Sequence, residues 1–412
     1  MLFFISIFTG LSWFLLLWRL RSVQAQFIIT FIYSYQIILL VSTAVEIPLD
    51  IFTDYDTNDN RFFLLYLNCV FFLSLVIGVW ISSQKLNVKT QKNIFRFSSS
   101  FIEKFFYMFI LLIIAMEPIF FKFTLFSGGY DNEKPGYFFE YTTVLICIYY
   151  AYSKNISVVK RHLPNCLHMF FCILAGERMM MITAVGSLLF SIDRMSFRLK
   201  NIILMIAFVA ALLFIDKFRS TADIDSGFLS KFLFDGVVTH HGSLLYSSLF
   251  IIDFSSTISH NLFDSFGAVL FLLGLDGSTQ GLGFADQLEM YGRRGGGGLF
   301  TAFAIALFGH PFGIIFIVII GVTLSRVLSK KNYGLKISPI ELIFVSFIIH
   351  GMLYTPLLIV KPVICGVITT TFLYLVCKIF KVSHARINTL RDGVHFSSIV
   401  HKQAGRKTAA ST

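Results

Sequence analysis

The chain has 412 residues, of which 56% are hydrophobic and 14% are charged, and its mean hydropathy is +0.76. Soluble globular domains carry about 25% charged residues, so this composition excludes an ordinary water-soluble domain, and lipid is the solvent that fits it. The net charge of +11 does not predict a nucleic-acid partner, because the basic residues fall between apolar runs, where cytoplasmic loops of membrane proteins collect Lys and Arg.

Eleven apolar runs qualify as transmembrane helices, each of which needs about 20 mostly apolar residues. In chain order they are 2–18, 25–46, 62–83, 101–122, 138–153, 163–177, 179–193, 200–216, 298–325, 338–358 and 362–380. The sixth and seventh are short and form either two helices or one long or re-entrant segment. The sequence therefore predicts an all-α polytopic membrane protein of about 11 transmembrane helices, within a range of about 10 to 12.

The connectors between these runs alternate in charge, which predicts the orientation. Basic residues gather at 19–21, 85–96, 154–161, 194–200, 326–336 and after Lys378, whereas 48–61 holds four Asp residues and 123–136 is polar and rich in turn residues. Because cytoplasmic loops carry the excess of Lys and Arg, the N-terminus is expected outside and the C-terminus in the cytoplasm. Residues 1–380 then form one transmembrane bundle, and 381–412 form a basic cytoplasmic tail that touches anionic lipid headgroups.

A single long connector, 217–297, joins the eighth run to the ninth on the outer side. It contains two semi-apolar pieces, 243–254 and 265–275, which we expect to lie as amphipathic helices on the outer leaflet. A connector of about 80 residues in a compact protein is usually functional. The candidate site residues are therefore sought on the outer face.

The turn between the sixth and seventh runs reads Gly176-Glu177-Arg178 and is expected to face outward. A Glu and an Arg in a short turn near lipid are costly unless they pair or meet a ligand. Two interpretations remain open: a local ion pair whose Arg reaches the interface, or an Arg178 guanidinium that clamps phosphate.

The first part of the long connector contains Arg219, Asp235, His240 and His241. Two adjacent histidines do not face one way on a helix, so a two-histidine metal pair is not predicted. The chain has no HExxH or comparable metal-binding set and no CxxC pair among its six cysteines, so neither a metal nor another cofactor is predicted. A solvated loop and a catalytic role for these residues both remain open.

The most specific local pattern precedes the ninth run, where Glu289 and Arg293-Arg294 lead into the glycine run Gly295–Gly298. Glycines such as Gly296 and Gly297 let the backbone approach a ligand closely. Backbone N–H groups at a helix N-terminus, with two Arg beside them, suit an anion such as pyrophosphate. The pattern lacks GxxxxGK[ST] and is not a P-loop; the alternative is a flexible basic loop.

Two histidines, His310 and His350, fall inside the ninth and tenth runs. We interpret them as hydrogen-bonded histidines of the bundle rather than as catalysts.

Taken together, these features resemble the O-antigen polymerases (Wzy type) and related oligosaccharide repeat-unit polymerases of bacterial envelopes. The resemblance covers the whole chain in architecture, through a bundle with 49 Phe residues and a long outer connector. In local motif it rests on the turn Gly176-Glu177-Arg178, on Gly295–Gly298 and on the stretch Leu307–Gly313, which reads LFGHPFG. It implies a GT-C-like bundle of the polymerase–ligase type in the bacterial inner membrane.

The resemblance also implies a function, namely metal-independent glycosyl transfer on the periplasmic side. The growing glycan on undecaprenyl pyrophosphate is the donor, a lipid-linked repeat unit is the acceptor, and a chain-length regulator protein is an implied partner besides the membrane lipids. A leaving pyrophosphate needs positive charge where charge develops, and the available clamps are Arg178, Arg219, Arg293 and Arg294, beside Gly296 and Gly297. The candidates for a base or orienting acceptor are Asp235, His240, His241 and Glu289.

Two other functions remain as alternatives. An O-antigen ligase would share the lipid-linked donor, and Ser259-His260-Asn261 faintly resembles the outer-loop histidine of that class. A polysaccharide transporter or flippase would need charged residues in the middle of helices, lining a path. In the sequence the charges cluster at the outer loops and turns, which ranks the transporter lower.

Overall fold

The computed structural model describes residues 1–20, 22–44, 58–84, 100–120, 136–153, 157–175, 178–192, 245, 247–253, 298–330, 337–353 and 359–378. Within these ranges the secondary structure is α-helical and includes no strand. The prediction of an all-α protein is confirmed for this part of the chain.

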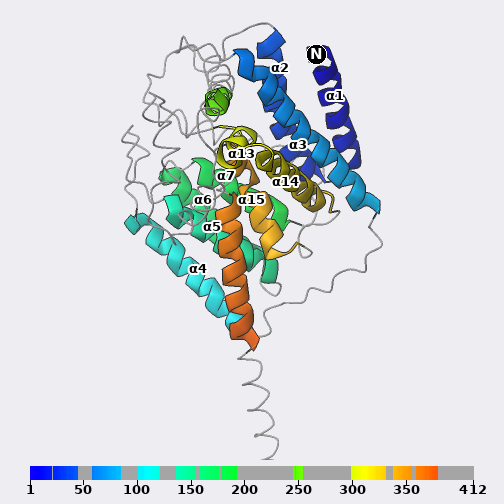
Figure 1. Ribbon diagram of the computed structural model, residues 1–412. Helices are drawn as coiled ribbons and strands as arrows, with labels where there is room; N and C mark the ends of the chain where they lie inside the picture. The colour runs from blue at the N-terminus through cyan, green and yellow to red at the C-terminus, as the bar shows by residue number, and fades with distance from the viewer. Residues whose placement is uncertain are drawn as a thin grey trace, which may run out of the picture.

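Two groups of helices make up the bundle (Figure 1). The first consists of α1 (Leu2–Arg19), α2 (Val23–Ala44), α3 (Asn58–Gln84), α13 (Phe300–Phe308) and α14 (Phe312–Leu328). The second consists of α4 (Ser100–Phe120), α5 (Gly136–Tyr152), α6 (Val158–Leu174), α7 (Arg178–Ser191) and α15 (Pro339–Leu353). A last helix, Ile359–Lys378, follows α15. Contacts of α13 and α14 with α15 join the two groups.

The first seven predicted runs correspond to α1 through α7, and the sixth and seventh are two separate helices. The eighth run, 200–216, lies outside the described residues. Four described helices are long and apolar enough to cross a membrane: Leu2–Arg19, Val23–Ala44, Asn60–Ser82 and Ile359–Lys378. The described chain is thus that of a helical membrane protein, and the total of about 11 spans stays a prediction.

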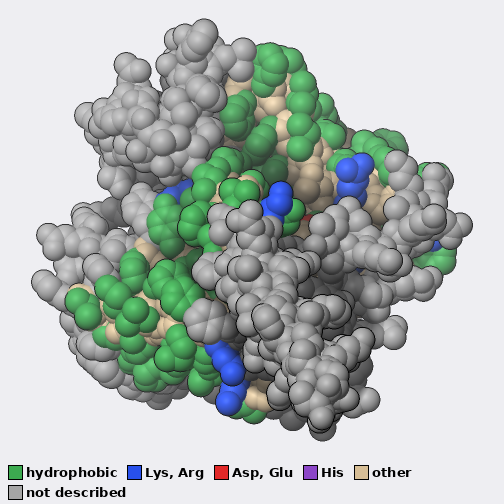
Figure 2. Space-filling view, turned by 90° about the horizontal axis from the view of Figure 1, so that it is seen from below, with side chains coloured by type: hydrophobic (Ala, Val, Ile, Leu, Met, Phe, Trp, Pro, Cys, Tyr) green, Lys and Arg blue, Asp and Glu red, His purple; other side chains and the backbone are tan. Residues whose placement is uncertain are grey.

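Large apolar side chains cover the outside of the helices. On α1, Phe3, Phe4, Phe14 and Trp18 are 65–74% exposed. Seen from below, hydrophobic side chains dominate the described surface and Lys and Arg appear as separate groups (Figure 2). Such a surface fits contact with lipid tails, because apolar area of this extent is unfavourable in water.

The closest helix pair, α3 and α14, packs through small residues. An added Cβ at Gly78 would lie 1.8 Å from Ser325 Oγ, and one at Gly321 would lie 1.7 Å from Ser74 Oγ. On each helix one Gly and one Ser are four residues apart, and the Ser of one helix packs against the Gly of the other. Small residues at this spacing let helix backbones approach closely in a membrane, where packing rather than the hydrophobic effect holds helices together.

The prediction of one continuous ninth helix over 298–325 is wrong. The chain forms two helices, α13 and α14, separated at Gly309-His310-Pro311. Gly309 has a φ of 65°, a left-handed conformation that ends helices, and Pro311 lacks the N–H that would continue the helix. The chain then turns back, so that α14 packs against α13. His310 accordingly lies exposed on a turn rather than inside a helix.

The expectation that 243–254 lies on the outer leaflet is also wrong for the residues that the structure describes there. Leu245, Leu249 and Ile251 are at most 1% exposed and belong to the main hydrophobic core. Burying these apolar side chains in the core stabilises the fold more than a half-buried position at the membrane interface would. The second semi-apolar piece, 265–275, lies outside the described residues.

A capping box begins α15. Glu341 Oε2 accepts a hydrogen bond from Ser338 N at 2.9 Å, and Ser338 Oγ accepts one from Glu341 N at 3.3 Å. Pro339 occupies the first helical position, where its missing N–H costs nothing. Lys330, just after α14, donates to the same Glu341 carboxylate at 2.5 Å and so ties the end of α14 to the start of α15.

Candidate functional site

Most of the residues that the sequence analysis selected lie outside the described residues. They are Gly176, Glu177, Arg219, Asp235, His240, His241, Glu289, Arg293, Arg294 and Gly295 to Gly297. Arg178 is the first residue of α7, which places its backbone at the predicted outer end of that helix. Gly298 is described, and it shows where the glycine run leads.

Gly298 lies inside the bundle, where its backbone is held by two neighbours. Its N–H donates to Leu353 O at 2.8 Å, and the next N–H, of Leu299, donates to Ser248 Oγ at 2.8 Å. A Cβ at Gly298 would lie 2.7 Å from Ile251 Cδ1 and 3.1 Å from the Phe303 ring. Gly298 is therefore closely packed against Ile251 of the outer connector and Phe303 of α13, so the last residue of the run is not part of a slack linker.

The half-helix α13 begins at mid-depth in the bundle. The Phe300 ring packs edge-on against the Phe71 ring, 4.8 Å between centroids, and Phe71 is midway along the apolar span Asn60–Ser82. Beyond the other end of α13, the His310 ring is 5.4 Å from that of Phe63, near the start of α3. From Phe300, level with the middle of α3, α13 thus runs over about 12 Å of helix toward the end of α3 that contains Phe63.

A small pocket of about 20 Å³ lies at the mid-depth end of α13. Its walls come from four elements and are mostly apolar: Phe31, Ile32, Tyr35, Asn68, Phe71, Phe72, Leu299, Phe300, Thr301, Ile349, Met352 and Leu353. Thr301 Oγ1 donates to Asn68 Oδ1 at 2.8 Å, and Asn68 Nδ2 donates to Gln36 Oε1 at 2.9 Å. The pocket therefore combines an apolar cavity with one polar relay across three helices.

A buried arginine lies on the same side of α3 as this relay. Arg61 precedes Asn68 by seven residues, two helical turns or about 10 Å toward the predicted outer surface. Arg61 is 7% exposed and donates to Ser42 O at 3.0 Å. Sequence reasoning missed Arg61 and Asn68, although each is a polar residue at the edge of or within an apolar run.

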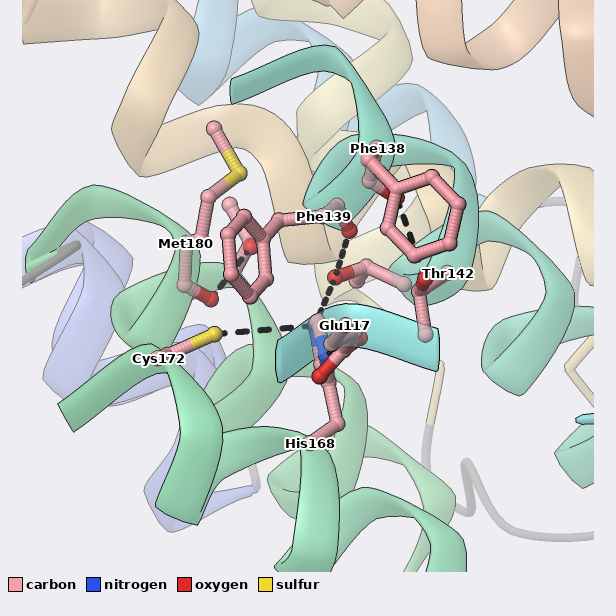
Figure 3. Close-up of polar contacts among 9 residues, drawn as sticks. Glu117, Phe138, Phe139, Thr142, His168, Cys172 and Met180 are labelled. Carbon is pink, nitrogen blue, oxygen red and sulfur yellow. Dashed lines mark hydrogen bonds and ion pairs between the residues drawn. The ribbon is translucent and has the colours of Figure 1, made fainter. Parts of the chain in front are cut away.

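A second polar cluster joins α4, α5 and α6 (Figure 3). His168 Nδ1 is 2.6 Å from Glu117 Oε1, and His168 Nε2 is 2.9 Å from Thr143 Oγ1. Cys172 Sγ lies 3.8 Å from the same Nε2, and the Phe139 ring packs 5.8 Å from the imidazole. The Glu117, His168, Thr143 and Cys172 side chains are fully buried.

An ion pair links α5 to the last helix. Lys361 Nζ lies 3.1 Å from Glu140 Oε2, with side chains 4% and 6% exposed. Lys361 also lies 5.5 Å above the Tyr141 ring. The expectation that the charges cluster at outer loops and turns is wrong for the described residues, because these two charges and the Glu117–His168 pair are buried within helices. They were missed because each partner comes from a different, sequence-distant helix.

The described residues contain no group of three or more His, Cys, Asp and Glu side chains that could hold a metal ion. The chemistry that the described arrangement offers is hydrogen bonding by Asn68 and Thr301 at the pocket, and proton binding at the Glu117–His168 pair.

Comparison of the chain with models of protein families, with curated proteins and with solved structures finds no match.

Proposed function

We propose that the chain is a metal-independent glycosyltransferase that polymerises undecaprenyl-pyrophosphate-linked oligosaccharide repeat units into O-antigen or a related surface polysaccharide, on the periplasmic side of the bacterial inner membrane. The observation that carries the proposal is the position of Gly298, the last residue of the glycine run. Gly298 lies inside the bundle, beside a small apolar pocket and at the N-terminal end of a half-helix.

The proposal is supported by the fit between this geometry and an amphiphilic donor. A polyprenyl chain needs apolar surface inside the membrane, and the exposed apolar faces of the helices supply it. A leaving pyrophosphate needs donors and positive charge nearer the outer surface. Arg293 precedes Gly298 by five residues, so it lies within about 17 Å of Gly298 along an extended chain. Arg293 and Arg294 can therefore reach any level between the pocket and the outer surface.

The test is the lipopolysaccharide pattern of a deletion strain. Loss of a polymerase leaves lipopolysaccharide with a single repeat unit, loss of a ligase leaves bare core, and loss of a flippase stops export. Complementation with wild-type protein should restore long chains. Bare core in the deletion strain would overturn the proposal in favour of the ligase.

Variants of the predicted clamps then test the site. Arg178→Ala should lower the polymerisation rate by roughly 10²–10³, equivalent to about 2–4 kcal/mol of transition-state stabilisation, and Arg178→Lys should rescue little, because an ammonium does not reproduce a bidentate guanidinium contact. Gly296→Val should shorten the polymer at unchanged protein abundance. Wild-type chain lengths from Arg178→Ala and Gly296→Val would leave the anion site without support.

The orientation is tested separately. Reporter fusions at residues 90 and 230 should lie on opposite sides of the membrane, with residue 90 in the cytoplasm, because basic connectors alternate along the chain. Both reporters on one side would contradict the topology.

A transporter or flippase of a lipid-linked glycan is the second candidate, and the structure supplies observations that favour it. Ionisable residues buried in membrane helices often mark transport or proton pathways, and here Glu117, His168, Glu140 and Lys361 are buried. Broken helices such as α13–α14 also occur at transporter binding sites. Purified protein in liposomes separates the two: a polymerase extends glycan chains from lipid-linked repeat units, whereas a flippase moves those units across the bilayer without extending them.

A further inference from the structure

The fully buried Glu117–His168 pair carries an inference that holds for either function. Its hydrogen bonds determine where the protons are. Thr143 Oγ1 donates to Phe139 O at 3.1 Å, so its hydroxyl proton is committed to its own helix. With that proton on Phe139 O, we assign the same oxygen as the acceptor for His168 Nε2, 2.9 Å away, which places a hydrogen on Nε2.

One proton then remains to be placed between His168 Nδ1 and Glu117 Oε1, which are 2.6 Å apart. It resides either on the imidazole, giving a carboxylate and an imidazolium, or on the carboxyl group, giving two neutral partners. An ionised carboxylate away from water is stabilised when several donors surround it. Glu117 Oε2 has no hydrogen-bond partner among the described residues and is inaccessible to solvent. In the neutral form, only a carbonyl oxygen lacks a donor. Burying that neutral oxygen costs less free energy than burying a carboxylate oxygen without a donor.

Among the side chains that the structure describes around the pair, no other charge reverses this preference. On α5, Glu140 is adjacent to Phe139 but is paired with Lys361. On α6, Cys172 is the other titratable group in contact, while Lys160, Arg161 and His162 lie at the opposite end of the helix. On α4, Glu103 and Lys104 also lie at the opposite end. On α7, Met180 and Met181 cover the cluster, and Arg178 is the one charged residue of the helix.

The pair lies toward the predicted outer end of the bundle. Glu117 is three residues before the end of α4, and His168 is six residues before the end of α6, which corresponds to depths of about 5 and 9 Å below those ends. The connector after α6 is the turn that contains Gly176 and Glu177. A hydrogen-bond donor that approaches from the predicted outer side would therefore reach Glu117 Oε2 before any other buried acidic group of α4 and α6.

We propose that Glu117 and His168 form a proton-binding site, in which the resting protein keeps a proton on the Glu117 carboxyl group and donates it to His168 Nδ1. When a hydroxyl, ammonium or guanidinium donor reaches Oε2, the proton moves to Nδ1, so that the carboxyl becomes a carboxylate and the imidazole becomes an imidazolium. No net proton is gained or lost in this step. The site thus converts the arrival of a donor at the outer end of the bundle into a buried charge pair.

Infrared spectroscopy of the purified full-length protein in lipid at neutral pH tests the resting state. Wild-type protein should show the carbonyl band of a protonated carboxylic acid. Glu117→Gln should lose it, and the matched change Glu140→Gln, in the other buried acidic residue of the same region, should keep it. A band that is present in Glu117→Gln and absent in Glu140→Gln would overturn the assignment. Absence of any carboxylic-acid band in wild-type protein would overturn it without any variant.

Nitrogen-15 NMR of histidine-labelled protein tests the second partner. At neutral pH, His168 should appear as a neutral ring protonated at Nε2. The His168 signal is assigned by its loss in His168→Gln. An imidazolium spectrum for His168 at neutral pH would show a permanent ion pair and overturn the proposal. Neither measurement depends on glycan polymerisation, so failure of the proposed function would not affect them.

Discussion

Gly313→Ala is the substitution for which the structure gives the most definite expectation. Gly313 lies at the start of α14, where the chain has just turned back from α13. A Cβ at this position would lie 2.6 Å from Ala304 O and 2.9 Å from Ile305 Cα. Both are backbone atoms of α13, so no side-chain rotation can relieve the overlap. The two helices would have to separate by several tenths of an ångström to restore ordinary contact distances.

The magnitude follows from two opposing effects. Overpacking of this kind costs about 1–3 kcal/mol, and replacing Gly by Ala in a helix returns up to about 1 kcal/mol. With the full gain subtracted, we expect a net loss of up to about 2 kcal/mol in the free energy of unfolding. Because α13 forms one wall of the pocket, the same change should shorten the glycan product if the proposed function holds.

The assay is reversible unfolding in mixed detergent micelles, with Gly10→Ala as the matched control. A Cβ at Gly10 meets nothing within 4 Å, so this variant should be neutral or slightly more stable. The reasoning would be refuted if Gly313→Ala were as stable as Gly10→Ala at equal helicity, since the close approach of α13 and α14 would then not exist.

Three further substitutions test the packing and the ion pair by the same unfolding measurement. Gly321→Ala should destabilise the protein because its Cβ meets Ser74 Oγ at 1.7 Å, and the added change Ser74→Gly should recover part of the loss through a coupling of about 0.5–3 kcal/mol; strictly additive effects would contradict the contact. Lys361→Met should cost about 3–5 kcal/mol by leaving the Glu140 carboxylate buried without its cation, whereas Glu140→Gln/Lys361→Met should recover most of it; a double variant no better than the single one would argue against the pair. Ser338→Ala should cost about 1 kcal/mol through loss of the α15 cap, and an unchanged stability would show that the cap does not form in the membrane.

The sequence by itself determined the solvent and the class of fold. Long apolar runs without charge leave no stable alternative to helices in lipid, because every backbone N–H and C=O must find its partner within the segment. The predicted positions of α1 to α7 were accordingly close to those observed. The capping box at Ser338 and Glu341 was also readable from sequence, since it depends on residues three apart, although the prediction of the tenth run did not use it.

Tertiary structure alone decided how the ninth run is divided and where the buried charges meet. Gly309 and Pro311 signal a possible break, but whether a chain kinks or turns back depends on what fills the space beside it. Here α14 packs against Ser74 and Gly78 of α3, while Ser248 and Ile251 of the outer connector contact the chain at the start of α13. The partners of Glu117 and Lys361 come from helices that are 51 and 221 residues away in sequence, at His168 and Glu140. No local pattern specifies such pairs, because they form only when packing removes both groups from lipid and water together.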